Sequence, residues 1–299
     1  MFDRRYYDRL GRLRLAIEKK SNASMQGGRK SSRKGNSAEF SDFREYMPGD
    51  DIRSIDWNAY ARLDRLYIKE FMEEKESTIT FILDFSRSME YGEKKKSELA
   101  SELTAALSYI ALLNQDRVMV MDAANPTRRF FASGGKAGYR NLERFLESTT
   151  GSEPADLFGA VKSLDKMQAG LTIVISDFMS EDFITLDDRT PQSELPLVKM
   201  IRYLKFRKQS VVLLHVLAKE ETDITLEGTC NLIDSEDNES KLRVTMDAES
   251  IGRYNAGLKA FTGNLKSICK KNGAGYHLCN TGTSFDRIIF NKLKELYEW

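Results

Sequence analysis

The sequence predicts an α/β fold with a doubly wound, mostly parallel sheet, helices on both faces, and an N-terminal extension. Three runs are almost wholly apolar, as in parallel strands covered on both faces: 79–84, 171–177 and 211–216. Segments with apolar residues at helical spacing alternate with them, at about 95–113, 138–148, 156–167 and 248–271. Other elements are expected as strands near 66–71, 117–121, 129–132 and 275–279, a hairpin around 229–246, and a helix at 285–297.

The chain divides by composition into three parts, 1–37, 38–76 and 77–299. In the first part, Leu10, Leu13 and Ile17 predict an amphipathic helix over 3–19, and a basic loop rich in Ser and Gly follows. This part holds eleven basic and three acidic residues, a net charge of +8, whereas the whole chain has 46 basic and 45 acidic residues. Nucleic-acid binding is therefore disfavoured for the chain and is an alternative only for this basic segment.

The expected location is the cytoplasm. No apolar run is long enough to span a membrane, and the charged start of the chain lacks the apolar middle of a secretory signal. The three cysteines, Cys230, Cys269 and Cys279, do not have the spacing of a disulfide framework.

A candidate metal site follows the first apolar strand. Asp84, Ser86 and Ser88 form a D-x-S-x-S loop, and Asp177 follows the second apolar strand. Ligands of such sheets bind at the carboxyl ends of the strands, so these four side chains are expected to converge. Oxygen-only ligands suit Mg²⁺ best, with Mn²⁺ or Ca²⁺ as alternatives. A plain turn that caps a helix is the other interpretation of the loop.

These two loops resemble the von Willebrand factor A (vWA) domain and its metal-ion-dependent adhesion site. The resemblance implies that Asp84, Ser86, Ser88 and Asp177 hold a cation, whose open coordination position takes a carboxylate of a partner protein. A threonine of that family is replaced here by Ala155, which implies weak or absent metal; Thr149, Thr150 or Ser152 are possible substitutes.

A longer motif lies upstream, at residues 39–57, EFSDFREYMPGDDIRSIDW, followed by Ala61-Arg62. It resembles the signature of the bacterial family called domain of unknown function 58. The resemblance covers nearly the whole chain and implies a vWA-like domain with an N-terminal extension. It also implies action together with a MoxR-type AAA+ ATPase and a client protein.

The charges of this motif have two interpretations, an ion-pair network that pins the extension around Tyr46 and Trp57, or a surface that docks a partner. They are Arg44, Asp50, Asp51, Arg53, Asp56 and Arg62. The function expected is that of a non-enzymatic adaptor or chaperone-like protein. A metal-free scaffold is the alternative, and a hydrolase is disfavoured because Ser86 stands where an aspartyl nucleophile would need a second carboxylate.

Overall fold

The computed structural model describes residues 4–15, 38–73, 77–133, 135–148, 154–164, 167–179, 194–225, 228–233 and 241–298. The chain forms two compact units. The core unit comprises residues 1–19 and 77–299, and the small unit comprises residues 20–76. Each unit is described by itself below.

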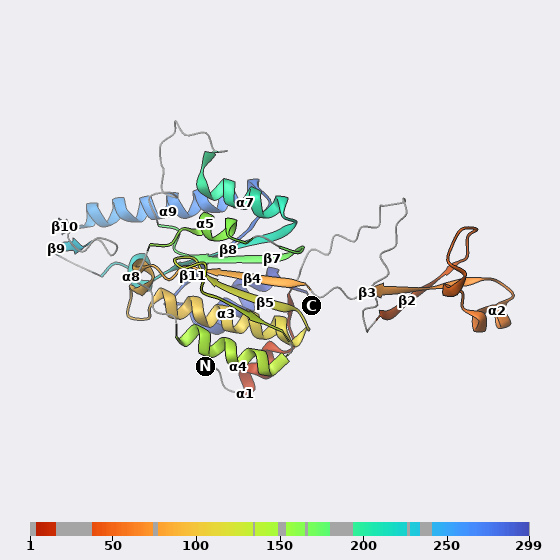
Figure 1. Ribbon diagram of the computed structural model, residues 1–299. Helices are drawn as coiled ribbons and strands as arrows, with labels where there is room; N and C mark the ends of the chain where they lie inside the picture. Colours follow the sequence, from red (N-terminus) through yellow and green to blue (C-terminus); the bar gives the residue numbers. More distant parts are fainter. Residues whose placement is uncertain are drawn as a thin grey trace. The chain divides into compact units, whose positions relative to one another are not determined.

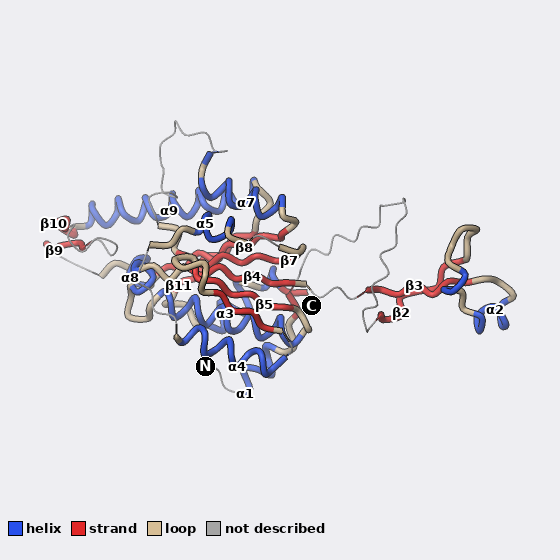
Figure 2. Tube along the Cα trace, in the orientation of Figure 1, coloured by secondary structure: helices blue, strands red, loops and turns tan. Residues whose placement is uncertain are grey.

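A six-stranded sheet forms the centre of the core unit (Figure 2). Its order is β11-β8-β7-β4-β5-β6, and all neighbours are parallel except β6, which runs antiparallel to β5. The bounds are Thr78–Leu83 for β4, Arg117–Asp122 for β5, Arg129–Ala132 for β6, Gly170–Ser176 for β7, Gln209–Leu217 for β8 and Gly275–Asn280 for β11. The mostly parallel α/β sheet predicted from the apolar runs is confirmed.

Helices cover both faces of this sheet, because alternate side chains of each strand point to opposite faces (Figure 1). Ile79, Phe81 and Leu83 of β4 belong to one core cluster, and Ile82 belongs to the other. The first cluster packs against α1 (Arg4–Leu10), α3 (Lys96–Leu113) and α4 (Gly135–Glu147). The second packs against α5 (Leu157–Lys162), α7 (Pro196–Phe206) and α9 (Ala248–Lys271).

Some elements differ from the sequence prediction. The first helix ends at Leu10, where Gly11 follows, and β1 (Arg14–Leu15) then pairs with β12 (Tyr297–Glu298). Ile17 lies outside the described residues. Helix α7 was not predicted, although Pro196 occupies its first turn.

The predicted C-terminal helix is broken into α10 (Phe285–Arg287), the π-helical turn η4 (Ile288–Lys292) and η5 (Lys294–Leu296). The hairpin expected near 229–246 is present as β9 (Gly228–Ile233) and β10 (Lys241–Met246). Two short helices follow strands of the sheet, η2 (Arg87–Glu90) after β4 and α8 (Lys219–Thr222) after β8.

The small unit is an antiparallel pair of strands, β2 (Ala38–Glu45) and β3 (Tyr67–Glu73), joined through η1 (Ile52–Ser54) and α2 (Trp57–Leu63). Trp57, expected to be a buried anchor, is 59% exposed. Ile55 and Ile68 are the buried apolar side chains among its described residues. The reason is size: a unit this small cannot enclose a large indole within its own core.

Candidate functional site

The candidate site lies where the sheet grows in two directions from β4, toward β5 on one side and β7 on the other. Leu83, the last residue of β4, is paired with Ile175, and the amide of Asp84 donates to the carbonyl of Ile175 at 2.9 Å. The loops after β4 and β7 therefore leave the sheet side by side. In open α/β sheets this switch in strand order is where ligands bind.

The Asp84 carboxylate is held by hydroxyl and amide donors from both loops. Its Oδ1 accepts hydrogen bonds from the Ser86 amide at 2.8 Å and the Ser86 hydroxyl at 2.6 Å. Its Oδ2 accepts from the Ser176 hydroxyl at 2.5 Å. The Ser86 and Ser88 hydroxyl oxygens lie 3.1 Å apart. The structure thus brings together the oxygen atoms of the D-x-S-x-S loop.

The second carboxylate, Asp177, is also buried and lies next to the first. Its Oδ1 accepts from the Met179 amide at 3.1 Å, and the Ser88 hydroxyl hydrogen-bonds to the same carboxylate. All four side chains that the sequence singled out, Asp84, Ser86, Ser88 and Asp177, therefore meet at one edge of the sheet.

Burial and mutual repulsion set the protonation of the two carboxyl groups. Burial, and after it the charge of Asp177, raises the pKa of Asp84, although the serine hydrogen bonds oppose this. Burial alone would also raise the pKa of Asp177, but the charge and hydrogen bond of Lys96 hold it below its usual value. The site consequently carries one carboxylate with a cationic partner and one without an ion-pair partner among the described residues.

Lys96 is the functional feature that sequence reasoning missed. Its ammonium lies 2.7 Å from Asp177 Oδ2 and 2.7 Å from Glu221 Oε1, and the side chain is 2% exposed. Burial would lower the pKa of Lys96, but Asp177 and Glu221 raise it above its ordinary value. The sequence does contain a sign of this burial, since Lys96 falls at helical spacing with Leu99, Ala100 and Leu103, on the buried face of α3.

The oxygen donors fit a hard divalent cation, since carboxylate and hydroxyl groups are ligands that Mg²⁺ accepts. Among the described residues, no group of three or more His, Cys, Asp or Glu side chains is arranged so that it could hold a metal ion, so a cation here would depend on the serine hydroxyls. Ala155 precedes α5, whose N-terminus is capped by Asp156. The substitutes considered for the missing threonine, Thr149, Thr150 and Ser152, lie outside the described residues.

In the small unit, most of the candidate partner-binding charges have structural tasks. Arg44 reaches both oxygens of Asp50 at 3.0 Å. Asp51 accepts from the Arg53 amide, and Asp56 caps α2 by accepting from two amides of its first turn. The side chains of Arg53 and Arg62 are exposed.

The family is shown by sequence comparison. The sequence model of the protein family of unknown function DUF58 matches residues 42–260, a range that includes most of the small-unit motif, from Asp42 onward, and the Asp84 loop. The chain belongs to the DUF58 family.

Similar chains are known in mycobacteria. The uncharacterized protein Rv1480 of Mycobacterium tuberculosis and the uncharacterized protein Mb1516 of Mycobacterium bovis are each 26% identical to this DUF58 chain over 177 residues. The match covers 56% of this chain and 55% of each relative, so it spans about half of their length.

Two solved structures are similar over 74% of this chain. One is the conserved hypothetical protein BatB of Bacteroides thetaiotaomicron, 18% identical, with a TM-score of 0.42 over 98% of that chain. The other, from Vibrio fischeri, is 10% identical, with a TM-score of 0.21 over 99% of that chain.

The cytoplasmic location predicted from the sequence is corrected by this comparison. The Vibrio fischeri protein is described as an uncharacterized membrane spanning protein. The location of this DUF58 chain is not established. Within the described part of the chain, no helix combines the length and the apolar character needed to cross a bilayer.

Proposed function

We propose that this chain is a non-enzymatic protein-binding module of the vWA type, whose partner engages the Asp84 edge through a divalent cation. One observation carries the proposal. Two buried carboxylates, Asp84 and Asp177, lie beside the Ser86 and Ser88 hydroxyls at the switch in strand order, and Asp84 contacts no cationic side chain among the described residues. An uncompensated buried carboxylate is costly, and a bound cation would remove that cost.

Asp84, Ser86 and Ser88 would hold the cation, with Mg²⁺ favoured over Mn²⁺ or Ca²⁺. Asp177 would act from a greater distance, because Lys96 already engages its Oδ2. When bound, the cation would offer an open coordination position to a carboxylate of the partner. With Ala155 in place of the family threonine there is one hydroxyl fewer, so weak binding is expected, with dissociation constants of about 0.1–1 mM.

A second candidate is a metal-free scaffold that binds partners at the same edge. The observation that favours it is Lys96, whose buried ammonium already supplies one positive charge between Asp177 and Glu221. In this case the cluster would fix the loops after β4 and β7 in one conformation, and partner binding would be independent of metal.

The proposed partners are a MoxR-type AAA+ ATPase and its client, a proposal that comes from the family resemblance. The small unit is the proposed docking surface for the ATPase. Arg53 and Arg62 are exposed there, and the same unit exposes the Trp57 and Tyr60 rings, whose centroids lie 6.2 Å apart. Arginine and aromatic side chains are enriched in protein interfaces.

Calorimetric titration with Mn²⁺ and Mg²⁺ tests the metal, and capture of a MoxR-type ATPase from the same organism tests the partner. Wild type is compared with Asp84→Asn, and Asp223→Asn, an exposed carboxylate after α8, is the matched control. The adhesion-site proposal requires heat in wild type and in the control, none in Asp84→Asn, and capture that depends on metal. No heat at about 1 mM metal together with full capture favours the scaffold. Metal binding with unchanged capture by Asp84→Asn would refute the Asp84 edge as the partner site.

A further inference from the structure

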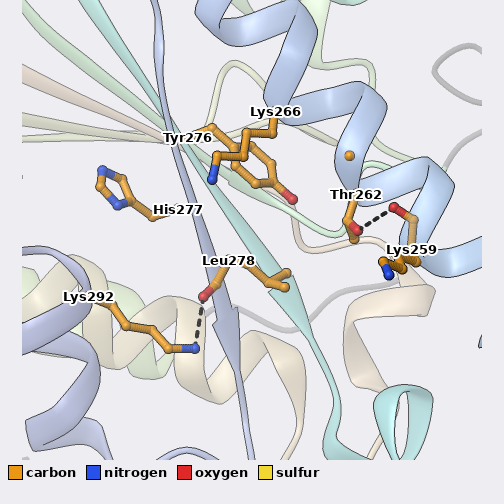
Figure 3. Close-up of a pocket in the computed structure, with 8 residues that line it drawn as sticks. Lys259, Thr262, Lys266, Tyr276, His277, Leu278 and Lys292 are labelled. Atoms are coloured by element: carbon orange, nitrogen blue, oxygen red, sulfur yellow. Dashed lines mark hydrogen bonds between the residues drawn. The ribbon is translucent and has the colours of Figure 1, made fainter.

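A groove runs along the outer side of β11, away from the Asp84 edge. It encloses about 480 Å³ between α9, β11 and η4. Figure 3 shows Tyr276 and Leu278 pointing to the α9 side of β11 and His277 to the opposite side. On α9 the groove is lined by residues at one helical face: Lys259, Thr262, Gly263 and Lys266.

Strand β11 is an edge strand, since β8 is its neighbour on one side and no described strand pairs with it on the other. In a parallel ladder the backbone groups of alternate residues point to the same side. The Leu278 carbonyl accepts a hydrogen bond from the Lys292 ammonium at 3.2 Å, so this carbonyl faces the groove (Figure 3). The backbone of Tyr276, two residues earlier, is expected to face it as well. The groove therefore exposes backbone groups of β11 with which an extended peptide could pair as a further strand.

The groove is also positively charged. The side chains of Lys259, Lys266 and Lys292 line it, and none of them forms an ion pair with another described residue. Lysine on an edge strand often prevents association of sheets. Here, however, two of the lysines belong to a helix beside the edge, and an open hollow separates them from the strand.

Gly263 keeps that hollow open. A Cβ atom at this position would meet nothing within 4 Å, and the same holds for Gly257, six residues earlier on α9 and not among the residues that line the groove. A larger residue is therefore compatible with the helix at both positions. The two glycines therefore form a matched pair, one inside the groove and one outside it.

We infer that this groove binds an extended acidic peptide, which adds a strand to β11. The peptide backbone pairs with the edge at Tyr276 and Leu278, displacing Lys292 from the Leu278 carbonyl. Its carboxylates face the α9 side, where Lys259 and Lys266 lie, and its alternate apolar side chains face the opposite side of the sheet, the side of His277. This site is independent of the cation proposed at Asp84.

The probe is a fluorescein-labelled peptide of alternating Glu and Val, seven residues long, titrated with the full chain and followed by anisotropy at about 50 mM salt. A peptide with Pro in place of Val has the same charge but cannot form a strand. A peptide with Lys in place of Glu reverses the charge. The inference requires binding of the Glu-Val peptide and at least tenfold weaker binding of the other two. No binding of the Glu-Val peptide, or equal binding of the Pro peptide, overturns it.

Two variant pairs locate the site. Gly263→Leu fills the groove without a change of charge and is expected to weaken binding at least tenfold, whereas Gly257→Leu leaves it unchanged. The double variant Lys259→Glu/Lys266→Glu is expected to abolish binding. Its control is the double variant Lys270→Glu/Lys271→Glu, which makes the same change of charge at the end of the same helix. Equal losses within either pair overturn the assignment. A dimer of the chain that Gly263→Leu dissociates would assign the groove to a second copy and overturn it too.

Discussion

Replacing Lys96 with methionine is expected to destabilise the core unit strongly. The substitution keeps most of the side-chain volume but removes the ammonium that lies 2.7 Å from both Asp177 and Glu221. The side chains of these two acids are 3% and 13% exposed, so water cannot replace the lost partner. Breaking a buried ion pair by removing one member typically costs about 3–5 kcal/mol. That is a large part of a stability of about 5–15 kcal/mol.

Lys95→Met is the matched control, at the N-cap position directly before α3. Lys95 is 47% exposed and pairs with Glu90 at 2.7 Å, so water can replace the lost partner and the stability should change little. Urea denaturation of wild type and both variants measures the difference. A cost below about 1 kcal/mol for Lys96→Met would show that the Lys96 ion pairs contribute little.

The pH dependence of this deficit has a defined sign. In wild type, Lys96 lowers the pKa of Asp177, and the stability that this contributes is present above the ordinary aspartate pKa and is lost as pH falls below it. In Lys96→Met, burial without a partner would instead raise the pKa of Asp177, so the variant regains stability as pH falls and Asp177 takes up a proton. The difference between the two proteins should therefore shrink from pH 7 toward pH 4. A difference that stays constant or grows would contradict this assignment.

Three other substitutions have definite expected outcomes. Asp84→Asn removes the charge that burial and Asp177 disfavour. In a thermal melt without metal, the Tm of this variant should therefore be about 2–4 °C above that of wild type, equivalent to ~1 kcal/mol. A Tm below that of wild type would contradict the charge argument. His215 is fully buried, and burial lowers its pKa to about 4. As pH falls from 6.5 to 4, the unfolded chain binds a proton at this histidine and the folded chain does not, so the unfolding free energy of wild type should fall by about 3 kcal/mol. His215→Phe should lose less over that range in urea titrations, and an equal loss would assign it to other groups. Trp57→Ala should cost less than about 1 kcal/mol, since the indole is 59% exposed; a cost of about 3–5 kcal/mol would show that it is buried in solution.

Local patterns were sufficient for much of the core unit. The apolar runs predicted β4, β7 and β8, because strands covered on both faces need apolar residues at successive positions. The long helix α9 and the hairpin before it were also predicted close to their observed bounds. The prediction of one continuous C-terminal helix was wrong, because a π-helical turn at η4 interrupts it. In this turn the Leu293 amide donates to the Ile288 carbonyl.

The small unit shows the opposite case. Its motif identified the family, yet it did not show which residues are buried, because burial depends on how much chain surrounds a side chain. Trp57 therefore appeared to be an anchor and is exposed. Asp56, a candidate for partner binding, is buried and caps α2.

The sequence by itself determined that Asp84 and Asp177 end strands of one sheet and that the D-x-S-x-S loop supplies only oxygen atoms. The tertiary structure decided that β4 and β7 are neighbours, which places the Ser176 hydroxyl on Asp84, and that Lys96 reaches Asp177 and Glu221. It also decided that β11 is an edge strand with lysines of α9 and η4 beside it. The physical reason is range: side-chain periodicity and turn chemistry act over a few residues, whereas strand order and ion pairing join residues about 80 to 125 positions apart.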